Sequence, residues 1–189
     1  MEKKTVYFEK TGKDNTGACL GVVRDIVSEG KHRHIVVAST TGSTGLLFSE
    51  AFKKTGLDLV VVTHSAGFRG PNTFEIPDET LERIKANGAR IFTGTILTHS
   101  LETSLSAKFN GVYPAMIIAT ALRRFGEGPK VCCEIVMMAA DAGLIPEGEE
   151  VIAVAGTGSG ADTVLIIKSA ASKRFLELKV LEIPAKPRV

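Results

Sequence analysis

The sequence has few cysteines and lacks the usual motifs of a metal site. It contains three cysteines in 189 residues, and two of them, Cys132 and Cys133, are adjacent in a mostly apolar run. An odd number with this spacing argues against a disulfide framework and favours a reducing compartment. No Cys-x-x-Cys pair and no Cys/His spacing indicates a zinc site, so we expect no metal.

Long apolar runs and excess charge are also missing. No stretch approaches the roughly 18–20 unbroken apolar residues of a membrane span, and no apolar run of the signal-peptide kind follows Met1. The formal net charge is only +2. Basic residues are scattered apart from residues 31–34, which we interpret as a solvated loop between a helix and a strand. These absences argue against membrane and nucleic-acid partners and predict a cytoplasmic protein.

What the sequence does contain is an alternation of short β-branched runs with segments of helical periodicity. This pattern predicts an α/β fold with three layers, in which helices cover both faces of a mostly parallel sheet. The length suits a single domain over residues 1–189. The final run, 175–183, alternates apolar and polar residues and predicts an edge strand with one exposed face. The other expected strands are 6–8, 35–38, 57–63, 90–93, 150–155 and 163–168, and the expected helices are 16–29, 43–55, 80–87, 114–125 and 129–143.

Hydroxyl groups and glycine gather between the strand at 35–38 and the helix that follows it. The first amides of a helix have no intrahelical partner and lie at its positive end, so a phosphate or phosphate ester fits this turn. The alternative is that serine and threonine only cap the helix. No lysine follows Gly45 until Lys53, so the turn is not a nucleotide-hydrolysing P-loop. The candidate ligand-binding residues here are Ser39, Thr40, Thr41, Gly42, Ser43 and Thr44.

A second glycine-rich segment covers residues 155–162 and contributes Thr157, Gly158 and Ser159 as candidates. The segment formally matches the G-x-G-x-x-G/A dinucleotide fingerprint, but that fingerprint must open a helix. Here a strand follows instead. We therefore interpret it as a loop between two strands, which either folds over an anion with its N–H groups or is simply a flexible hairpin loop.

Two further loops follow the strands at 57–63 and 90–93. Ligands of open α/β sheets bind outside the carboxyl ends of the strands, so we expect these loops to converge on the same rim. Arg69 is a candidate partner for a phosphate, and His64 for a phosphate or ring oxygen. Taken singly, His64 and His99 are each better explained as hydrogen-bonded loop residues, and no nucleophile–base pair is evident from spacing. The candidates from these loops are His64, Ser65, Gly67, Arg69, Thr93, Gly94 and Thr95.

From about residue 15 to 168, the chain resembles the C-terminal α/β domain of pyruvate kinase. The resemblance lies in residues 34–52 (HIVVASTTGSTGLLFSEAF), which match a strand, a phosphate loop and a helix. It lies also in residues 139–168 (AADAGLIPEGEEVIAVAGTGSGADTVLIIK), which match a helix, a strand, a glycine loop and an antiparallel strand. The N-terminal strand, residues 96–113 and the last strand look like additions.

The resemblance implies a binding site for a phosphorylated ligand. In pyruvate kinase the two loops hold a phosphorylated sugar, which here would place a phosphate at residues 41–44 with Gly158–Gly160 closing on it. Ser43 stands where the family often has a basic residue or threonine, which disfavours a sugar bisphosphate. The kinase chemistry resides in a (β/α)₈ barrel of about 250 residues, so no pyruvate kinase activity is expected of this chain. Resemblance to stand-alone prokaryotic versions of the domain implies flavin mononucleotide (FMN).

Three classes of function follow from these observations. The leading hypothesis is an FMN-binding protein, which would be a small FMN-dependent oxidoreductase if the flavin is redox-active. The second is a regulatory module that senses sugar phosphates or nucleotides. The third is an interaction domain for a partner chain, or a homo-oligomer that associates through its final strand.

Overall fold

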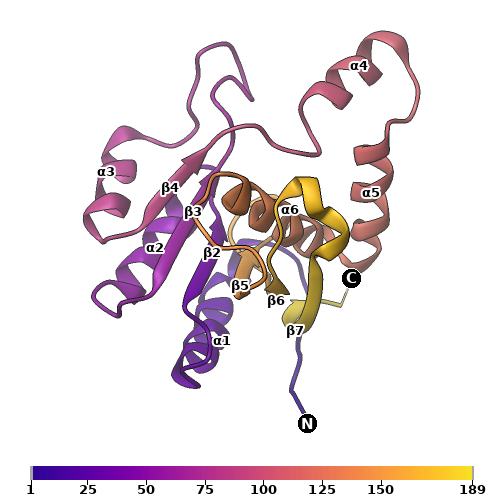
Figure 1. Cartoon of the computed structure of the whole chain (residues 1–189). Helices are drawn as coiled ribbons and strands as arrows, with labels where there is room; N and C mark the ends of the chain where they lie inside the picture. The colour runs from indigo at the N-terminus through magenta and orange to yellow at the C-terminus, as the bar shows by residue number, and fades with distance from the viewer. Residues whose placement is uncertain (1, 189) are drawn as a thin grey trace.

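The computed structural model describes residues 2–188 and contains one seven-stranded sheet (Figure 1). The order of its strands is β1-β7-β6-β5-β2-β3-β4. Strands β2, β3, β4 and β5 run parallel, and β6 is antiparallel to both of its neighbours. The mixed sheet with an antiparallel strand near the C-terminus confirms the predicted fold class. The strands are β1 Val6–Phe8, β2 His34–Ala38, β3 Asp58–Thr63, β4 Arg90–Thr93, β5 Glu150–Ala155, β6 Thr163–Lys168 and β7 Lys179–Pro187.

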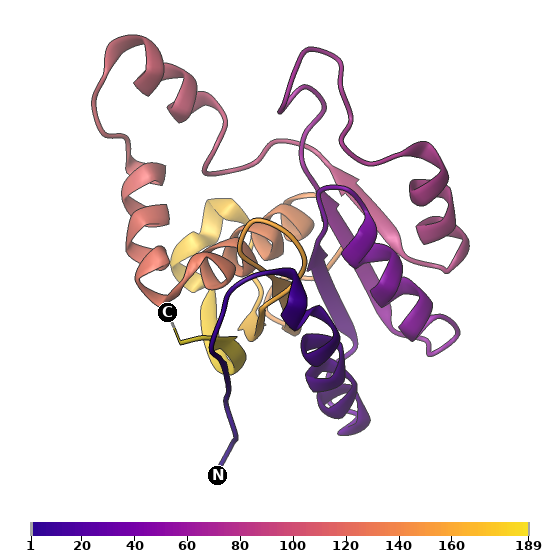
Figure 2. The same cartoon turned by 180° about the vertical axis from the view of Figure 1, so that it is seen from behind.

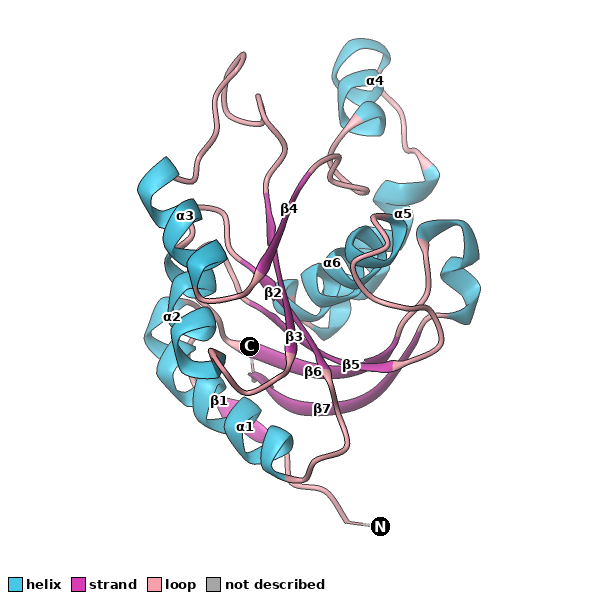
Figure 3. Ribbon diagram, turned by 60° about the vertical axis from the view of Figure 1, so that its left-hand side comes forward, coloured by secondary structure: helices cyan, strands magenta, loops and turns pink. Residues whose placement is uncertain are grey.

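Helices cover both faces of this sheet. Helices α1, α2 and α3 lie on one face and α6 on the other, as Figure 3 shows. Successive residues of each central strand point to opposite layers, so Val37 packs with Phe48 of α2, whereas Val36 packs with Val136 of α6. The helices are α1 Thr16–Ser28, α2 Ser43–Phe52, α3 Asp78–Ala86, α4 Leu101–Phe109, α5 Pro114–Leu122 and α6 Glu127–Asp141, with short 3₁₀ helices η1 Lys13–Asn15, η2 Arg123–Phe125 and η3 Ser172–Glu177.

The register brings the carboxyl ends of the parallel strands to one edge. Ala38 at the end of β2 lies opposite Val62 of β3, and Thr63 lies opposite Thr93 of β4. On the other side of β2, Val37 lies opposite Val154 of β5. The four loops that follow β2, β3, β4 and β5 therefore leave the sheet at the same edge, as the sequence predicted.

The prediction of an edge strand at 175–183 is confirmed only in part. Residues Ser172–Glu177 form η3, and β7 begins only at Lys179. β1 pairs with the outer side of β7 only at residues 185–187, where Val6 aligns with Ala185. Val180 and Leu181, in the first half of β7, are both exposed, whereas Ala185 in the second half is buried.

Helix α4 was not predicted from the sequence. Its apolar residues Leu101, Leu105 and Phe109 recur at helical spacing, yet all three are exposed and the helix has no buried residue. Figures 1 and 2 show α4 and α5 standing away from the sheet. No helix within residues 2–188 is both long and apolar enough to cross a membrane.

The loop at residues 31–34 is only partly solvated. Lys31 and Arg33 are exposed as predicted, but His32 is buried. His32 Nε2 lies 3.3 Å from a carboxylate oxygen of Glu150, and His34 Nδ1 lies 3.3 Å from one of Asp58. The two imidazoles thus lie beside acidic residues at the starts of neighbouring strands, which the charge pattern did not reveal.

Candidate functional site

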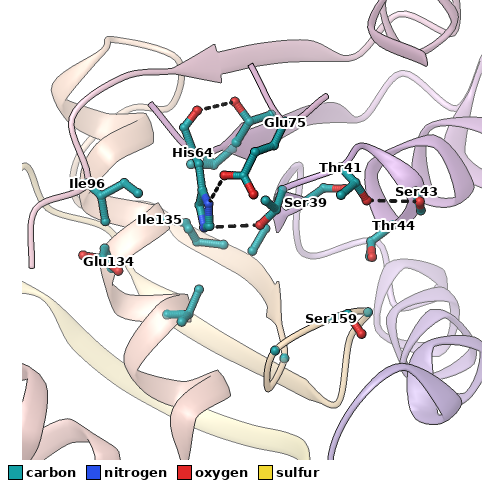
Figure 4. A pocket seen from close by; sticks show the side chains of 18 of the residues that line it. Ser39, Thr41, Ser43, Thr44, His64, Glu75, Ile96, Glu134, Ile135 and Ser159 are labelled. Carbon is teal, nitrogen blue, oxygen red and sulfur yellow. Dashed lines mark hydrogen bonds and ion pairs between the residues drawn. The ribbon is translucent and has the colours of Figure 1, made fainter. Parts of the chain in front are cut away.

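A pocket of about 640 Å³ lies at the carboxyl edge of the sheet. Its walls come from the turn after β2, the loops after β3, β4 and β5, and the first turns of α1 and α6. Figure 4 shows the hydroxyl groups of Thr41, Ser43, Thr44 and Ser159 on one side of the cavity and Ile96, Ile135 and Glu134 on the other. The volume suits a small organic ligand, since such pockets measure about 300–1,000 Å³.

The turn between β2 and α2 presents free backbone amides beside hydroxyl groups. Gly42 has φ +87°, and a Cβ there would lie 2.5 Å from Cγ2 of Thr80, so only glycine fits this turn. The amide of Gly45 donates to Ser39 Oγ at 2.9 Å. No hydrogen bond within residues 2–188 uses the amides of Ser43 or Thr44. These two donors at the positive end of α2 are available to an anion.

The glycine loop after β5 closes the pocket by packing on the start of α1. A Cβ on Gly160 would lie 2.4 Å from Cα of Lys13, and the amide of Ala161 donates to Thr16 Oγ1 at 3.0 Å. Buried Asp162 accepts hydrogen bonds from the amides of Gly12 (2.8 Å) and Thr157 (3.1 Å). The loop is thus fixed by side chains and does not behave as an unsupported hairpin.

His64 forms the centre of a hydrogen-bonded chain on one wall. Its Nε2 lies 3.2 Å from Thr40 Oγ1, and its Nδ1 lies 2.7 Å from Glu75 Oε2. The other oxygen of Glu75 accepts from Arg69 Nε at 3.2 Å. The ring of Phe68 lies 4.3 Å from the His64 ring, centroid to centroid. Figure 4 shows the His64–Glu75 pair and the bond that continues it toward the β2–α2 turn.

The opposite wall carries a buried ion pair. Lys130 Nζ lies 2.7 Å from Glu134 Oε2, and the two side chains are 2% and 5% exposed. Burial alone would raise the pKa of Glu134, but the charge of Lys130 and hydrogen bonds from Lys130 and Thr98 more than offset this and lower it. The carboxylate is therefore ionised, and the first two turns of α6 hold a fixed charge pair against the cavity.

His99 lies beside this charge pair. Thr98 Oγ1 donates to Glu134 Oε1 at 2.6 Å. His99 Nδ1 lies 2.9 Å from Thr98 Oγ1 and 3.5 Å from Lys130 Nζ, and His99 Nε2 lies 3.4 Å from a guanidinium nitrogen of Arg123. Burial, followed by the charge of Lys130, lowers the pKa of His99. His99 is thus a neutral imidazole.

The family of this chain follows from a comparison with known families. Residues 18–167 match the family model described as "Pyruvate kinase, alpha/beta domain". The chain belongs to this family. The match confirms the resemblance drawn from the two glycine-containing loops, and the residues outside it include β1 and β7.

Solved structures give weaker matches to this pyruvate kinase α/β domain. A pyruvate kinase from Cryptosporidium parvum matches with a TM-score of 0.43 and 15% identity, over 82% of this chain and 23% of that one. An O-ureido-L-serine synthase matches with a TM-score of 0.33 and 17% identity, over 69% of this chain and 48% of that one. Both scores are too low to bear on function, and the chain spans only about a quarter of the kinase.

The structure brings most of the predicted site residues of this α/β domain to one cavity. Those that line the pocket are Ser39, Thr40, Thr41, Ser43, Thr44, His64, Arg69, Gly158 and Ser159. Those that do not line it are Gly42, Ser65, Gly67, Thr93, Gly94, Thr95 and Thr157. Gly42 packs against Thr80 and Ile76 on the side of the turn away from the pocket. The Thr93 hydroxyl pairs with Thr63 Oγ1 at 2.6 Å. The strand-end position alone did not distinguish lining residues from supporting ones.

Other lining residues were missed from the sequence. They come from η1 and α1, from the end of the loop after β3, and from α6, and include Lys13, Thr16, Glu75, Lys130 and Glu134. Glu75 lies eleven residues from His64, with no spacing rule to join them. Lys130 and Glu134 have the i,i+4 spacing of an ordinary surface pair, so only the fold shows that they face a cavity.

Proposed function

We propose that this chain binds a small phosphorylated ligand in the pocket at the carboxyl edge of its sheet, with FMN as the first candidate. The observation that carries the proposal is the pairing of two environments within one cavity of about 640 Å³. At one end the free amides of Ser43 and Thr44 adjoin several hydroxyl groups, which suits a phosphate. At the other end Ile96, Ile135 and Met138 lie beside the Lys130–Glu134 pair.

Apolar side chains of the cavity suit a ring. Ile96, Ile135 and Met138 line the cavity, together with Leu47 and Phe68. A flat aromatic system buries well against such side chains. FMN has one phosphate and one large ring, so the donor set and these side chains both suit it. When bound, it would supply redox chemistry, and the protein would then be a small oxidoreductase.

Binding is tested by thermal unfolding of the purified chain with FMN, riboflavin and fructose 1,6-bisphosphate. We expect FMN to stabilise the protein by about 2.7 kcal/mol when present at 100 times its dissociation constant. Riboflavin, which lacks the phosphate, should stabilise it less. Mass spectrometry and an absorption spectrum of the purified protein would identify a flavin carried through purification.

A variant that places a negative charge at the phosphate end of the pocket tests the site. Ser43→Asp puts a carboxylate beside the free amides of α2 and should abolish stabilisation by FMN. Ser104→Asp, on the exposed face of α4 outside the pocket, is the control and should respond as the natural chain does. If FMN gives no stabilisation, the flavin assignment is wrong. If only sugar phosphates or nucleotides stabilise, the chain is a regulatory module instead.

Association with another chain remains a prediction. The final strand, through which we predicted a homo-oligomer, exposes Val180 and Leu181, and exposed apolar side chains are more numerous on α4. Such surfaces are typical of interaction sites. Light scattering on the purified chain would give its mass in solution and decide whether copies associate.

A further inference from the structure

We infer that Thr40, His64 and Glu75 form a catalytic relay that hydrolyses small carboxylic esters. The relay has the order hydroxyl, imidazole, carboxylate, with distances of 3.2 Å from Thr40 Oγ1 to His64 Nε2 and 2.7 Å from His64 Nδ1 to Glu75 Oε2. Each imidazole nitrogen thus has one partner. This is the arrangement by which a base activates a hydroxyl nucleophile while a carboxylate orients the base.

Burial does not force these three groups together. The His64 side chain is 31% exposed and Thr40 is half-buried, so water could satisfy both. Instead, the fold of the loop after β3 brings Glu75 to His64. The Gly67 amide donates to Thr73 O at 2.9 Å, and Gly67 and Asn72 both have positive φ, which turns the chain back on itself. Glu75, at 15% side-chain exposure, is held from its other side by Arg69.

The surroundings of Thr40 complete the requirements for acyl transfer. Thr40 lies in a strand–turn–helix connection, between the end of β2 and the first turn of α2. The amide of the next residue, Thr41, takes part in no hydrogen bond within residues 2–188, so it can stabilise an oxyanion formed beside Thr40. Thr40 and His64 line the cavity together with Ile96 and Phe68, which gives an apolar space for the ester.

The reaction balances with water as its second substrate. Thr40 Oγ bonds to the ester carbonyl carbon as its proton passes to His64 Nε2, and the carbonyl electron pair moves onto oxygen. The carbon–oxygen bond to the alcohol then breaks, and His64 gives its proton to the leaving oxygen. Water attacks the acyl group with His64 again as base, and the proton returns to Thr40 Oγ. The products are an acid and an alcohol.

This activity goes beyond ligand binding but uses the same cavity, because Ile96 and Phe68 would also cover the ring of FMN. The phosphate would use the Ser43 and Thr44 amides, whereas the ester would react at Thr40. Hydrolysis is assayed without added flavin, and flavin binding without ester, so either proposal can fail alone.

The test uses p-nitrophenyl acetate as the probe with the full chain. We expect hydrolysis above the buffer rate, and a transient acetyl group on Thr40 located by peptide mass spectrometry. Removing the base in His64→Gln should lower the rate about 10²- to 10⁴-fold, and Thr40→Val should lower it as far. Thr40→Ser keeps a hydroxyl and should restore hydrolysis, and Glu75→Gln should lower kcat more than it changes KM.

Thr55→Val, at the far end of α2 and outside the pocket, is the matched control and should keep the natural rate. Circular dichroism melts of each variant establish that it is folded. The inference is overturned if the natural chain does not exceed buffer, if folded Thr40→Val keeps its rate, or if the acetyl group forms on a lysine or on His64 alone.

Discussion

Gly160 and Gly158 share a backbone conformation in the loop between β5 and β6 but differ in what surrounds them. Their φ values are +71° and +75°, in the left-handed region where a Cβ costs roughly 1–2 kcal/mol. A Cβ on Gly160 would lie 2.4 Å from Cα of Lys13 and 2.6 Å from Thr16 Oγ1, whereas one on Gly158 would have no neighbour within 4 Å. Gly160 therefore sets how closely this loop approaches α1.

Alanine at the two positions separates strain from contact. We expect Gly158→Ala to lower the free energy of unfolding by about 1–2 kcal/mol through φ alone. Gly160→Ala carries the same strain and must also displace the start of α1, which adds about 1–3 kcal/mol. Urea unfolding followed by circular dichroism measures both. Equal losses would show that the loop does not depend on its contact with Lys13 and Thr16.

At the scale of single elements, α6 combines a packing helix with a polar wall of the site. Its apolar residues Cys132, Ile135 and Val136 are buried beneath the sheet, and the same helix directs Lys130 and Glu134 toward the pocket. Breaking a buried pair by removing one partner costs about 3–5 kcal/mol, whereas replacing both with apolar residues is often neutral. The Lys130–Glu134 pair therefore gives the cavity a polar wall but contributes little net stability.

A double-mutant cycle tests this reading of α6. Lys130→Met or Glu134→Leu alone should lower the free energy of unfolding by about 3–5 kcal/mol, and the double variant should lose much less. The pKa of Glu134 is lowered in the folded chain, so its stabilisation is present above the unfolded pKa and is lost as pH falls through the folded one. The double variant should therefore lose less stability between neutral pH and the folded pKa. Additive single losses would show that the two side chains do not interact.

Element by element, the sequence predicted what depends on local pattern. The helix at α6 follows from its apolar periodicity, and β2 and β3 follow from unbroken β-branched runs. Helix α4 escaped prediction because Leu101, Leu105 and Phe109 face solvent, so their periodicity marks no core. The break between η3 and β7 was missed because residues 175–178 alternate like the strand that follows them.

At the scale of the whole molecule, parallel strands bring distant loops to one edge, and this made the site partly predictable. Residues of the β2–α2 turn and His64 were placed together from the rule that ligands bind at strand carboxyl ends. Glu75 and Thr16 were not, because their approach depends on how a long loop folds back and on how α1 meets the glycine loop. Tertiary contacts of this kind leave no local pattern in a sequence.

The three cysteines report on whether the two helical layers unfold together. All are free and buried, with Cys19 in the layer of α1–α3 and Cys132 and Cys133 in the layer of α6. Burial, with a smaller contribution from the Asp162 charge, raises the pKa of Cys19 to about 12, and burial raises that of Cys133 to about 11. Thiolates are the reactive form, so all three should be inert in the folded chain.

The two helical layers pack on opposite faces of the same sheet. We therefore expect unfolding of the sheet to expose all three thiols at once. Reaction with Ellman's reagent at pH 8 should be negligible without denaturant and should appear in a single urea transition that coincides with the loss of circular dichroism. Cys19→Ala removes the only thiol of its layer and so identifies the signal of Cys19. In this variant, Cys132 and Cys133 should react at the unfolding midpoint of the variant itself. Reaction of Cys19 at lower urea than Cys132 and Cys133 would mean that α1 separates from the sheet first, and the glycine loop that rests on Lys13 and Thr16 would then open with it.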